Sequence, residues 1–339
     1  MGREVSQYSV KCIPIETSGL VVRMPKVRTV FLSASDIAVP CLERLLKISD
    51  CQLVGVVTQP ERPRGRGQKY SPNPITTWAQ SHRVACLQTE QMDNNLFVEL
   101  QQMRTDIALV MAFGHILKRR FLDLPALGMW NFHTSLLPKY RGASPIQTCL
   151  LTGEHETGVT LMRMVEKLDA GPWIAQKVVG IEAQETACSL TQKLAHASAD
   201  LLAECWGRLI QKNYSVVEQT ESSATITRKL YKADGLLDFN KTALSLERKV
   251  RALNPWPGTF FHWGSECIKV HTAHVIDKEI AYKPNTVLFD FCQCPLGIAT
   301  SMGVLAIDQL QRSGGKILHA KEFLNGNKFL FQVNKSTQL

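Results

Sequence analysis

The fold is decided by the stretch from Val27 to Thr58, which opens with VRTVFLSA and closes with LVGVVT. Both runs are apolar enough for buried strands, and residues 37–48 between them repeat Leu and Val at helical spacing. Such a β-α-β unit joins parallel strands through a helical crossover. Apolar runs at 107–113 and 128–132 predict further strands. We therefore predict an α/β fold with a doubly wound, Rossmann-like sheet.

The second half of the chain has a different pattern. A periodic segment at 189–210 predicts a closing helix, and a Ser- and Thr-rich segment with little periodicity follows it. Short strand-like runs then predict a small β-barrel domain; they span 259–263, 267–275, 286–289, 297–300 and 304–309. The predicted organisation is a flexible extension at 1–26, a catalytic domain at 27–212, a linker at 213–231 and a C-terminal domain at 232–339.

Composition narrows the class of protein. The chain has 339 residues, 45% of them hydrophobic, which suits two packed domains. Its formal charge of +9 favours an anionic partner. The ten cysteines include no paired CxxC units, so we expect reduced thiols and no metal site. No run approaches a membrane span. Glu4 and Glu16 argue against a mitochondrial transit peptide, so we expect the bacterial cytoplasm rather than the mitochondrial matrix. We also expect a monomer.

A candidate active site lies at the end of the apolar run 127–132. Asn131 and His133 are two residues apart, so they lie on the same face if this run is a strand. Asp169, in the turn-forming stretch 168–171, could reach the imidazole and fix its tautomer and charge. A structural histidine and an ordinary turn aspartate are the alternative interpretations of the same pattern.

Resemblance decides between these interpretations. The stretch 131–145, the stretch 157–160 (TGVT) and the stretch 168–171 (LDAG) are similar to the signature of the 10-formyltetrahydrofolate-dependent formyltransferases. Three further segments resemble the methionyl-tRNA formyltransferases within that family, and they are TQPERPRGRG at 58–67, ITRKL at 226–230 and RALNPWP at 251–257. The likeness covers nearly the whole chain, from about residue 27 to about residue 327.

The resemblance implies an activity, a donor and a partner. The implied enzyme transfers a formyl group from 10-formyltetrahydrofolate, a substrate, to the α-amino group of initiator methionyl-tRNA. Asn131 and His133 would stabilise the oxyanion of the tetrahedral intermediate. Asp169 would either hold and charge His133 or accept a proton from the attacking amine, and the sequence leaves both roles open. The C-terminal domain would be an OB-like barrel that binds tRNA.

The resemblance also assigns contacts to the substrates. Folate would be bound by the loop after the catalytic strand and by main-chain groups at the end of the preceding one; these residues are Ser135, Leu136, Leu137, Pro138, Met111 and Gly114. The basic loop at 59–74 is too rich in Pro and Gly for a helix and suits an irregular RNA end. The predicted tRNA contacts are Arg62, Arg64, Arg66 and Lys69 in this loop, with Lys249 and Arg251 in the C-terminal domain.

Two other classes of function remain open at this point. One is a different enzyme that uses 10-formyltetrahydrofolate, such as a hydrolase or a small-molecule formyltransferase, because the central residues would be shared. The basic loop and the stretch 254–257 argue against it. The other is a non-enzymatic RNA-binding protein that uses the barrel alone, which would leave Asn131, His133 and Asp169 without a reason to be assembled.

Overall fold

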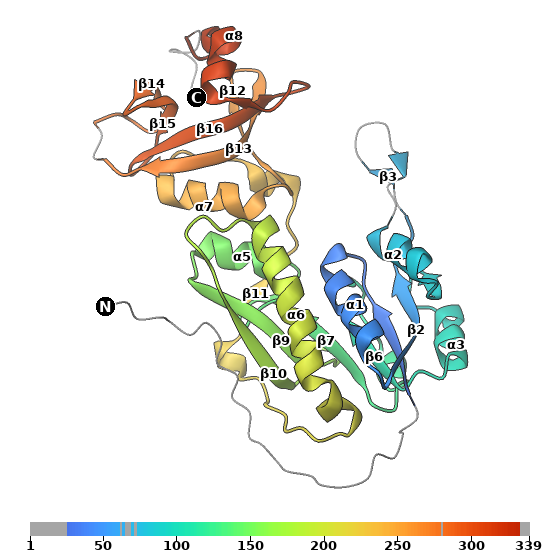
Figure 1. The fold of residues 1–339 in the computed structure, drawn as a ribbon. Helices are drawn as coiled ribbons and strands as arrows, with labels where there is room; N and C mark the ends of the chain where they lie inside the picture. Colours follow the sequence, from blue (N-terminus) through green and yellow to red (C-terminus); the bar gives the residue numbers. More distant parts are fainter. Residues whose placement is uncertain (1–25, 62, 65–68, 71–72, 279–280, 333–339) are drawn as a thin grey trace, which may run out of the picture. The chain divides into compact units, whose positions relative to one another are not determined.

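The structure is a computed structural model that describes residues 26–61, 63–64, 69–70, 73–278 and 281–332. Contacts within the chain divide it into two compact units (Figure 1). The first unit runs to residue 145 and also contains 156–180 and 191–227, and the second contains 146–155, 181–190 and the chain from 228 onward. The predicted extension lies outside the described residues except for Lys26. The predicted domain boundaries remain predictions.

The first unit is built on a seven-stranded sheet with the order β10-β9-β7-β6-β1-β2-β5. Its strands are β1 (Val27–Leu32), β2 (Cys51–Thr58), β5 (Cys86–Gln88), β6 (Ile107–Val110), β7 (Met129–His133), β9 (Glu156–Arg163) and β10 (Trp173–Gly180). The five strands from β7 to β5 pair in parallel, whereas β9 and β10 extend the sheet antiparallel. The predicted parallel sheet is confirmed, and its antiparallel edge is an addition that was not predicted.

Helices cover both faces of this sheet. They are η1 (Asp36–Ala38), α1 (Val39–Lys47), α2 (Pro74–His82), α3 (Asn94–Gln102), α4 (Arg119–Leu122) and α6 (Ala187–Ile210), the last of which begins in the second unit. Val30 and Leu32 of β1 share a core cluster with residues of α3 and α4. Phe31, between them, is fully buried on the opposite face. On that face α1 is tied to α6 by an ion pair from Arg44 to Asp200 at 3.3 Å.

Two pairs of very short strands complete the first unit. β3 (Pro63–Arg64) and β4 (Lys69–Tyr70) form an antiparallel pair within the predicted basic loop. β8 (Arg141–Gly142) pairs in parallel with β11 (Ile226–Thr227), and η2 (Glu221–Ser223) precedes β11. The segment predicted to be a linker therefore forms secondary structure with a loop that lies far earlier in the chain.

The second unit contains an antiparallel sheet with the order β12-β13-β16-β15-β14, to which β17 is added beside β16. Its elements are α5 (Pro145–Thr152), η3 (Lys232–Gly235), α7 (Ala243–Leu253), β12 (Thr259–Trp263), β13 (Glu266–Ile276), β14 (Val287–Phe291), β15 (Cys294–Ala299), β16 (Val304–Arg312), β17 (Leu318–His319) and α8 (Ala320–Gln332). Apolar side chains of α7 and α8 share one core with the sheet. The predicted fold class is confirmed, with its second domain built on an antiparallel sheet.

Among the described residues, no helix is both long and apolar enough to cross a membrane.

Candidate active site

The candidate site lies at the carboxyl ends of three parallel strands, β1, β6 and β7. These strands are neighbours in the sheet, so their carboxyl ends share one edge. The chain changes direction across the sheet between β1 and β6, because β2 and β5 lie on one side of β1 and β6 and β7 on the other. Ligands of doubly wound sheets bind at such a switch point. The backbone already links the loops there, since Ala34 N donates to Ala112 O at 3.2 Å.

Asn131 and His133 lie on the last residues of β7, as predicted. Both are buried, with 8% and 6% of their surface exposed. β7 is enclosed between β6 and β9, which fixes the direction of its side chains. Among the described residues the Asn131 carboxamide makes no hydrogen bond, so its two donors and its oxygen remain available to a ligand.

The backbone fixes the protonation of one nitrogen of His133. Nε2 lies 2.8 Å from the carbonyl oxygen of Tyr140. Because a carbonyl oxygen can only accept, Nε2 must carry the hydrogen. Nδ1, the other ring nitrogen, faces Asp169 Oδ2 at 3.6 Å.

Asp169 reaches the site from a tight turn. Its φ of +46° lies in the left-handed region, which is uncommon for residues other than Gly. Its Oδ2 accepts a hydrogen bond of 2.8 Å from the Gly142 N–H. Gly171 closes the turn, and a Cβ there would lie 1.9 Å from the carbonyl oxygen of Arg163. The structure thus brings together the three residues predicted to be catalytic, although their roles remain predictions.

The loop predicted to bind folate is held by its own side chains. Ser135 is fully buried, and its hydroxyl donates to the carbonyl of Lys139 at 2.6 Å. Leu137 is buried as well, and its N–H donates to Thr160 Oγ1 at 3.1 Å. The peptide bond between Leu137 and Pro138 is cis. Ser135 and Leu137 therefore shape the loop, while Leu136 and Pro138 are partly exposed.

The end of β6 supplies the other predicted folate contacts. Met111 is completely buried, and its N–H donates to the carbonyl of Leu32 at 3.0 Å. Gly114 has a φ of +77°, a conformation that favours Gly. Gln59 supports this segment by donating to the carbonyl of Phe113 at 3.0 Å. The folate contacts predicted at Met111 and Gly114 remain predictions.

Several residues that hold the site were not recognised from the sequence. Thr160 Oγ1 donates to the carbonyl of Ser135 at 2.6 Å, and Gln176 Nε2 donates to the carbonyl of Leu137 at 2.8 Å. Gln219 Nε2 donates to the carbonyls of Asp169 and Gly171 at 2.8 and 2.7 Å. No local pattern marks Gln219, because its partners lie 50 and 48 residues earlier.

The predicted tRNA contacts in the basic loop are only partly described. Arg62 and Arg66 lie outside the described residues. The backbones of Arg64 and Lys69 pair with each other across β3 and β4. Their contacts with tRNA remain predictions.

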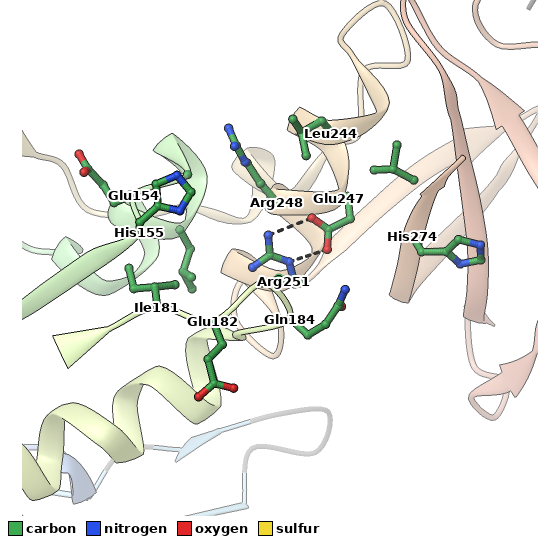
Figure 2. Close-up of a pocket in the computed structure, with 14 residues that line it drawn as sticks. Glu154, His155, Ile181, Glu182, Gln184, Leu244, Glu247, Arg248, Arg251 and His274 are labelled. Atoms are coloured by element: carbon green, nitrogen blue, oxygen red, sulfur yellow. Dashed lines mark hydrogen bonds and ion pairs between the residues drawn. The ribbon is translucent and has the colours of Figure 1, made fainter. Parts of the chain in front are cut away.

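The two predicted tRNA contacts on α7 are engaged within the second unit. Arg251 Nη2 donates to Glu247 Oε2 at 2.9 Å and Nη1 donates to the carbonyl of Glu185 at 2.7 Å. Figure 2 shows the ion pair between Arg251 and Glu247 in a polar pocket of this unit. Lys249 Nζ donates to the carbonyl of Leu236 at 2.6 Å, and burial lowers the pKa of its ammonium group. These bonds leave further donors on both side chains, and their contacts with tRNA remain predictions.

Arg248, which precedes Lys249 on α7, is in a different position. Its guanidinium packs on Gly153, where a Cβ would lie 2.1 Å from Cζ. Within the described part of the chain it makes no hydrogen bond or ion pair, and it lines the same pocket (Figure 2). The donors of Arg248 are therefore unengaged by this part of the chain.

The described residues contain no group of three or more His, Cys, Asp or Glu side chains that could hold a metal ion. No disulfide bond joins any two of the cysteines in this part of the chain.

Comparison with known proteins identifies the family. A sequence model described as formyl transferase matches residues 28–205, and a second, described as formyl transferase, C-terminal domain, matches residues 229–328. The methionyl-tRNA formyltransferase of Alkaliphilus oremlandii is 35% identical over 301 residues, which cover 88% of this chain and 96% of the relative. The protein of the same name from Roseiflexus castenholzii is 38% identical over 300 residues, which cover 88% of this chain and 96% of the relative.

Solved structures share the fold. The N-formyltransferase from Helicobacter canadensis, in complex with folinic acid and dTDP-3-aminofucose, aligns with a TM-score of 0.61 and 20% identity over 83% of this chain and 99% of its own. HypX from Aquifex aeolicus, in complex with tetrahydrofolic acid, aligns with a TM-score of 0.58 and 16% identity over 91% of this chain and 48% of its own.

The fold is a doubly wound sheet with an Asn, a His and an Asp at its switch-point edge, and the matches specify the class of protein. This chain belongs to the formyl transferase family. The family recognised from the sequence is confirmed, and so is the predicted class of enzyme, a one-carbon transferase.

Proposed function

We propose that this protein transfers the formyl group of 10-formyltetrahydrofolate to the α-amino group of initiator methionyl-tRNA. The observation that carries the proposal is the convergence of Asn131, His133 and Asp169 on one edge of the sheet. The unbonded carboxamide of Asn131 is a donor suited to a developing oxyanion, and so is Nδ1 of His133 when it carries a proton. The Asp169 carboxylate beside them is a proton acceptor.

The reaction requires one bond to form and one to break. The lone pair of the amine attacks the formyl carbon, and the carbonyl electrons move onto the formyl oxygen. Collapse of the tetrahedral intermediate restores the carbonyl and breaks the bond to folate N10, which takes a proton. Asn131 Nδ2–H and protonated His133 Nδ1–H stabilise the oxyanion, at about 3–4 kcal/mol per donor.

Asp169 performs two tasks in this scheme. Its carboxylate faces Nδ1 of His133 and orients the imidazole. It also accepts the proton that the amine loses, directly or through a water molecule, and returns it to folate N10. The amine needs such an acceptor because its reference pKa of about 7.7–8.0 leaves much of it protonated at neutral pH.

The choice of acceptor rests on the relatives. Curated proteins that match 88% of this chain carry the name methionyl-tRNA formyltransferase. The net charge of +9 suits a polyanionic partner. Arg248 adds an unengaged cation on α7 of the second unit. The structural relatives complexed with folinic acid and tetrahydrofolic acid support a folate as the donor. We also propose that the protein is a monomer. Its proposed location is the cytoplasm.

The test is transfer of labelled formyl from 10-formyltetrahydrofolate to charged initiator methionyl-tRNA. Controls are uncharged initiator tRNA, charged elongator methionyl-tRNA, an amino sugar nucleotide and a reaction without acceptor. Label on the initiator aminoacyl-tRNA supports the proposal. Label on the sugar nucleotide, or folate hydrolysis without an acceptor, would replace it with one of the other formyl-folate activities.

A further inference from the structure

The partners of His133 and Asp169 are close together in the chain. The carbonyl of Tyr140 accepts from His133, and the N–H of Gly142 donates to Asp169. The three residues 140–142 therefore set the spacing between the two catalytic side chains. Whatever holds this tripeptide also holds the catalytic pair.

We propose that Gln219 is a positioning residue that acts through Asp169, as the central contact of a strap formed by residues 219–227. The inference rests on the proposed function and deepens it. The strap contacts both the turn that carries Asp169 and the tripeptide 140–142, and it fixes their positions relative to each other. It lies within the segment that the sequence predicted to be only a linker.

Gln219 uses both amide donors and its amide oxygen on this task. Its amide nitrogen donates to the carbonyls of Asp169 and Gly171, on either side of Ala170. Its amide oxygen accepts from Arg141 Nε at 2.9 Å. The orientation of the amide is therefore determined, because a reversed amide would face two carbonyl oxygens with its own oxygen. One side chain thus joins the Asp169 turn to residue 141.

The turn needs external support because Asp169 has a left-handed backbone conformation. Its φ of +46° is intrinsically unfavourable for a residue with a Cβ. Within the turn, Ala170 N donates to the carbonyl of Lys167 at a long 3.3 Å. The two shorter bonds from Gln219 hold the main chain at Asp169 and at Gly171, and so they restrict the direction in which the Asp169 carboxylate points.

A second set of contacts joins the strap to the same two regions. Arg141, which is buried, donates from Nη1 to Glu221 Oε1 at 3.0 Å. The other oxygen of Glu221 accepts from Lys167 Nζ at 2.8 Å, and Lys167 is two residues before Asp169. Thr225 completes the connection, because its hydroxyl accepts from Tyr140 N–H at 2.7 Å and its carbonyl accepts from Arg141 N–H at 2.8 Å.

The test is a steady-state comparison of Gln219→Glu and Gln219→Met with the wild type. Either change removes the donors to Asp169 and Gly171 and nearly preserves the length of the side chain. We expect kcat for formyl transfer to fall about 10- to 100-fold, while KM for the folate changes less than about threefold. Glu218→Gln is the matched control, because Glu218 is exposed and makes no hydrogen bond or ion pair within the described chain. Wild-type kcat in both Gln219 variants would overturn the inference.

A double-mutant cycle separates positioning from general stability. If Gln219 acts only through Asp169, adding Gln219→Glu to Asp169→Asn should lower kcat by less than about a further twofold. If Gln219→Glu lowers kcat only by weakening the fold, its fold-decrease should multiply with that of Asp169→Asn. A multiplied decrease in the double variant would overturn the inference. Thermal unfolding of every variant shows whether the fold is retained.

An exchange measurement keeps the inference separate from the proposed function. Hydrogen exchange of the Gly142 amide, which donates to Asp169, should be about tenfold faster in Gln219→Glu than in the wild type and unchanged in Glu218→Gln. Faster exchange in Gln219→Glu would support the positioning role whether or not the protein transfers a formyl group to tRNA. Absence of that transfer would refute the proposed function alone. Equal exchange in the Gln219 variant and the wild type would overturn the positioning role even if the enzyme is active.

Discussion

The two sides of the candidate site are built in different ways. His133 and Asn131 lie on β7, which is enclosed by β6 and β9, so the sheet itself sets their direction. Asp169 lies in a left-handed turn, where its carboxylate accepts from the Gly142 N–H and its main-chain carbonyl accepts from Gln219. The strand side is therefore preorganised by regular structure, whereas the turn side depends on contacts made across the chain. Mutations can test this difference.

Asp169→Asn should have the largest effect. Asn tolerates a positive φ and can still accept from the Gly142 N–H, so the turn should be retained. Loss of the carboxylate should lower kcat about 10²- to 10⁴-fold, as for a general base. Steady-state formyl transfer measures kcat, and hydrogen exchange at Gly142 checks the turn. A variant that retains wild-type kcat would show that the turn side of the site is not catalytic.

Asn131→Ala should separate catalysis from stability on the strand side. Its carboxamide has no hydrogen-bond partner within the described residues, so its removal leaves no protein group unsatisfied. We expect kcat to fall about 10²- to 10³-fold, as for loss of one oxyanion donor. The unfolding temperature should remain close to that of the wild type in thermal denaturation. Asn95→Ala, at an exposed position of α3, is the control. A large loss of stability with normal kcat would contradict the assigned role.

Gly142→Ala should damage the connection between the tripeptide 140–142 and the strap. A Cβ at this position would lie 2.3 Å from the carbonyl oxygen of Thr227, and φ is +110°. We expect a loss of about 1–3 kcal/mol in the free energy of unfolding and a roughly tenfold lower kcat. Gly314→Ala is the matched control, because Gly314 also has a positive φ but has open space at the Cβ position. Equal effects of the two changes would show that the contact with Thr227 is unimportant.

Glu221→Gln should have the smallest effect, and this effect should depend on pH. Hydrogen bonds from Lys167 and Arg141 lower the pKa of the Glu221 carboxyl group. A lowered pKa in the folded state stabilises the protein above the unfolded pKa, and the contribution is lost as pH falls through the folded pKa. The wild type should therefore have a higher urea midpoint than the variant at about pH 7 and the same midpoint near about pH 2. A difference that persists at low pH would exclude this explanation.

Much of the fold could be predicted from local pattern. The apolar runs of β1, β2 and β7 and the periodic segment of α6 match strands and a helix in the structure. β9 was not predicted, although most of it is buried, because its antiparallel pairing with β7 is made across the intervening helix α5 and is not a local property of the sequence. The alternation along β7 was enough to place Asn131 and His133 on one face.

The sequence by itself determined the two kinds of sheet and the family, because strand alternation and contiguous motifs are local properties, and it predicted the three central side chains. Only the tertiary structure decided which imidazole nitrogen of His133 carries its hydrogen, because that depends on the carbonyl of Tyr140. It also decided how Asp169 is held, because Gln219 lies 50 residues away and its contacts leave no periodic pattern. Hydrogen bonds between distant segments form only when the chain has folded, so local sequence could not reveal them.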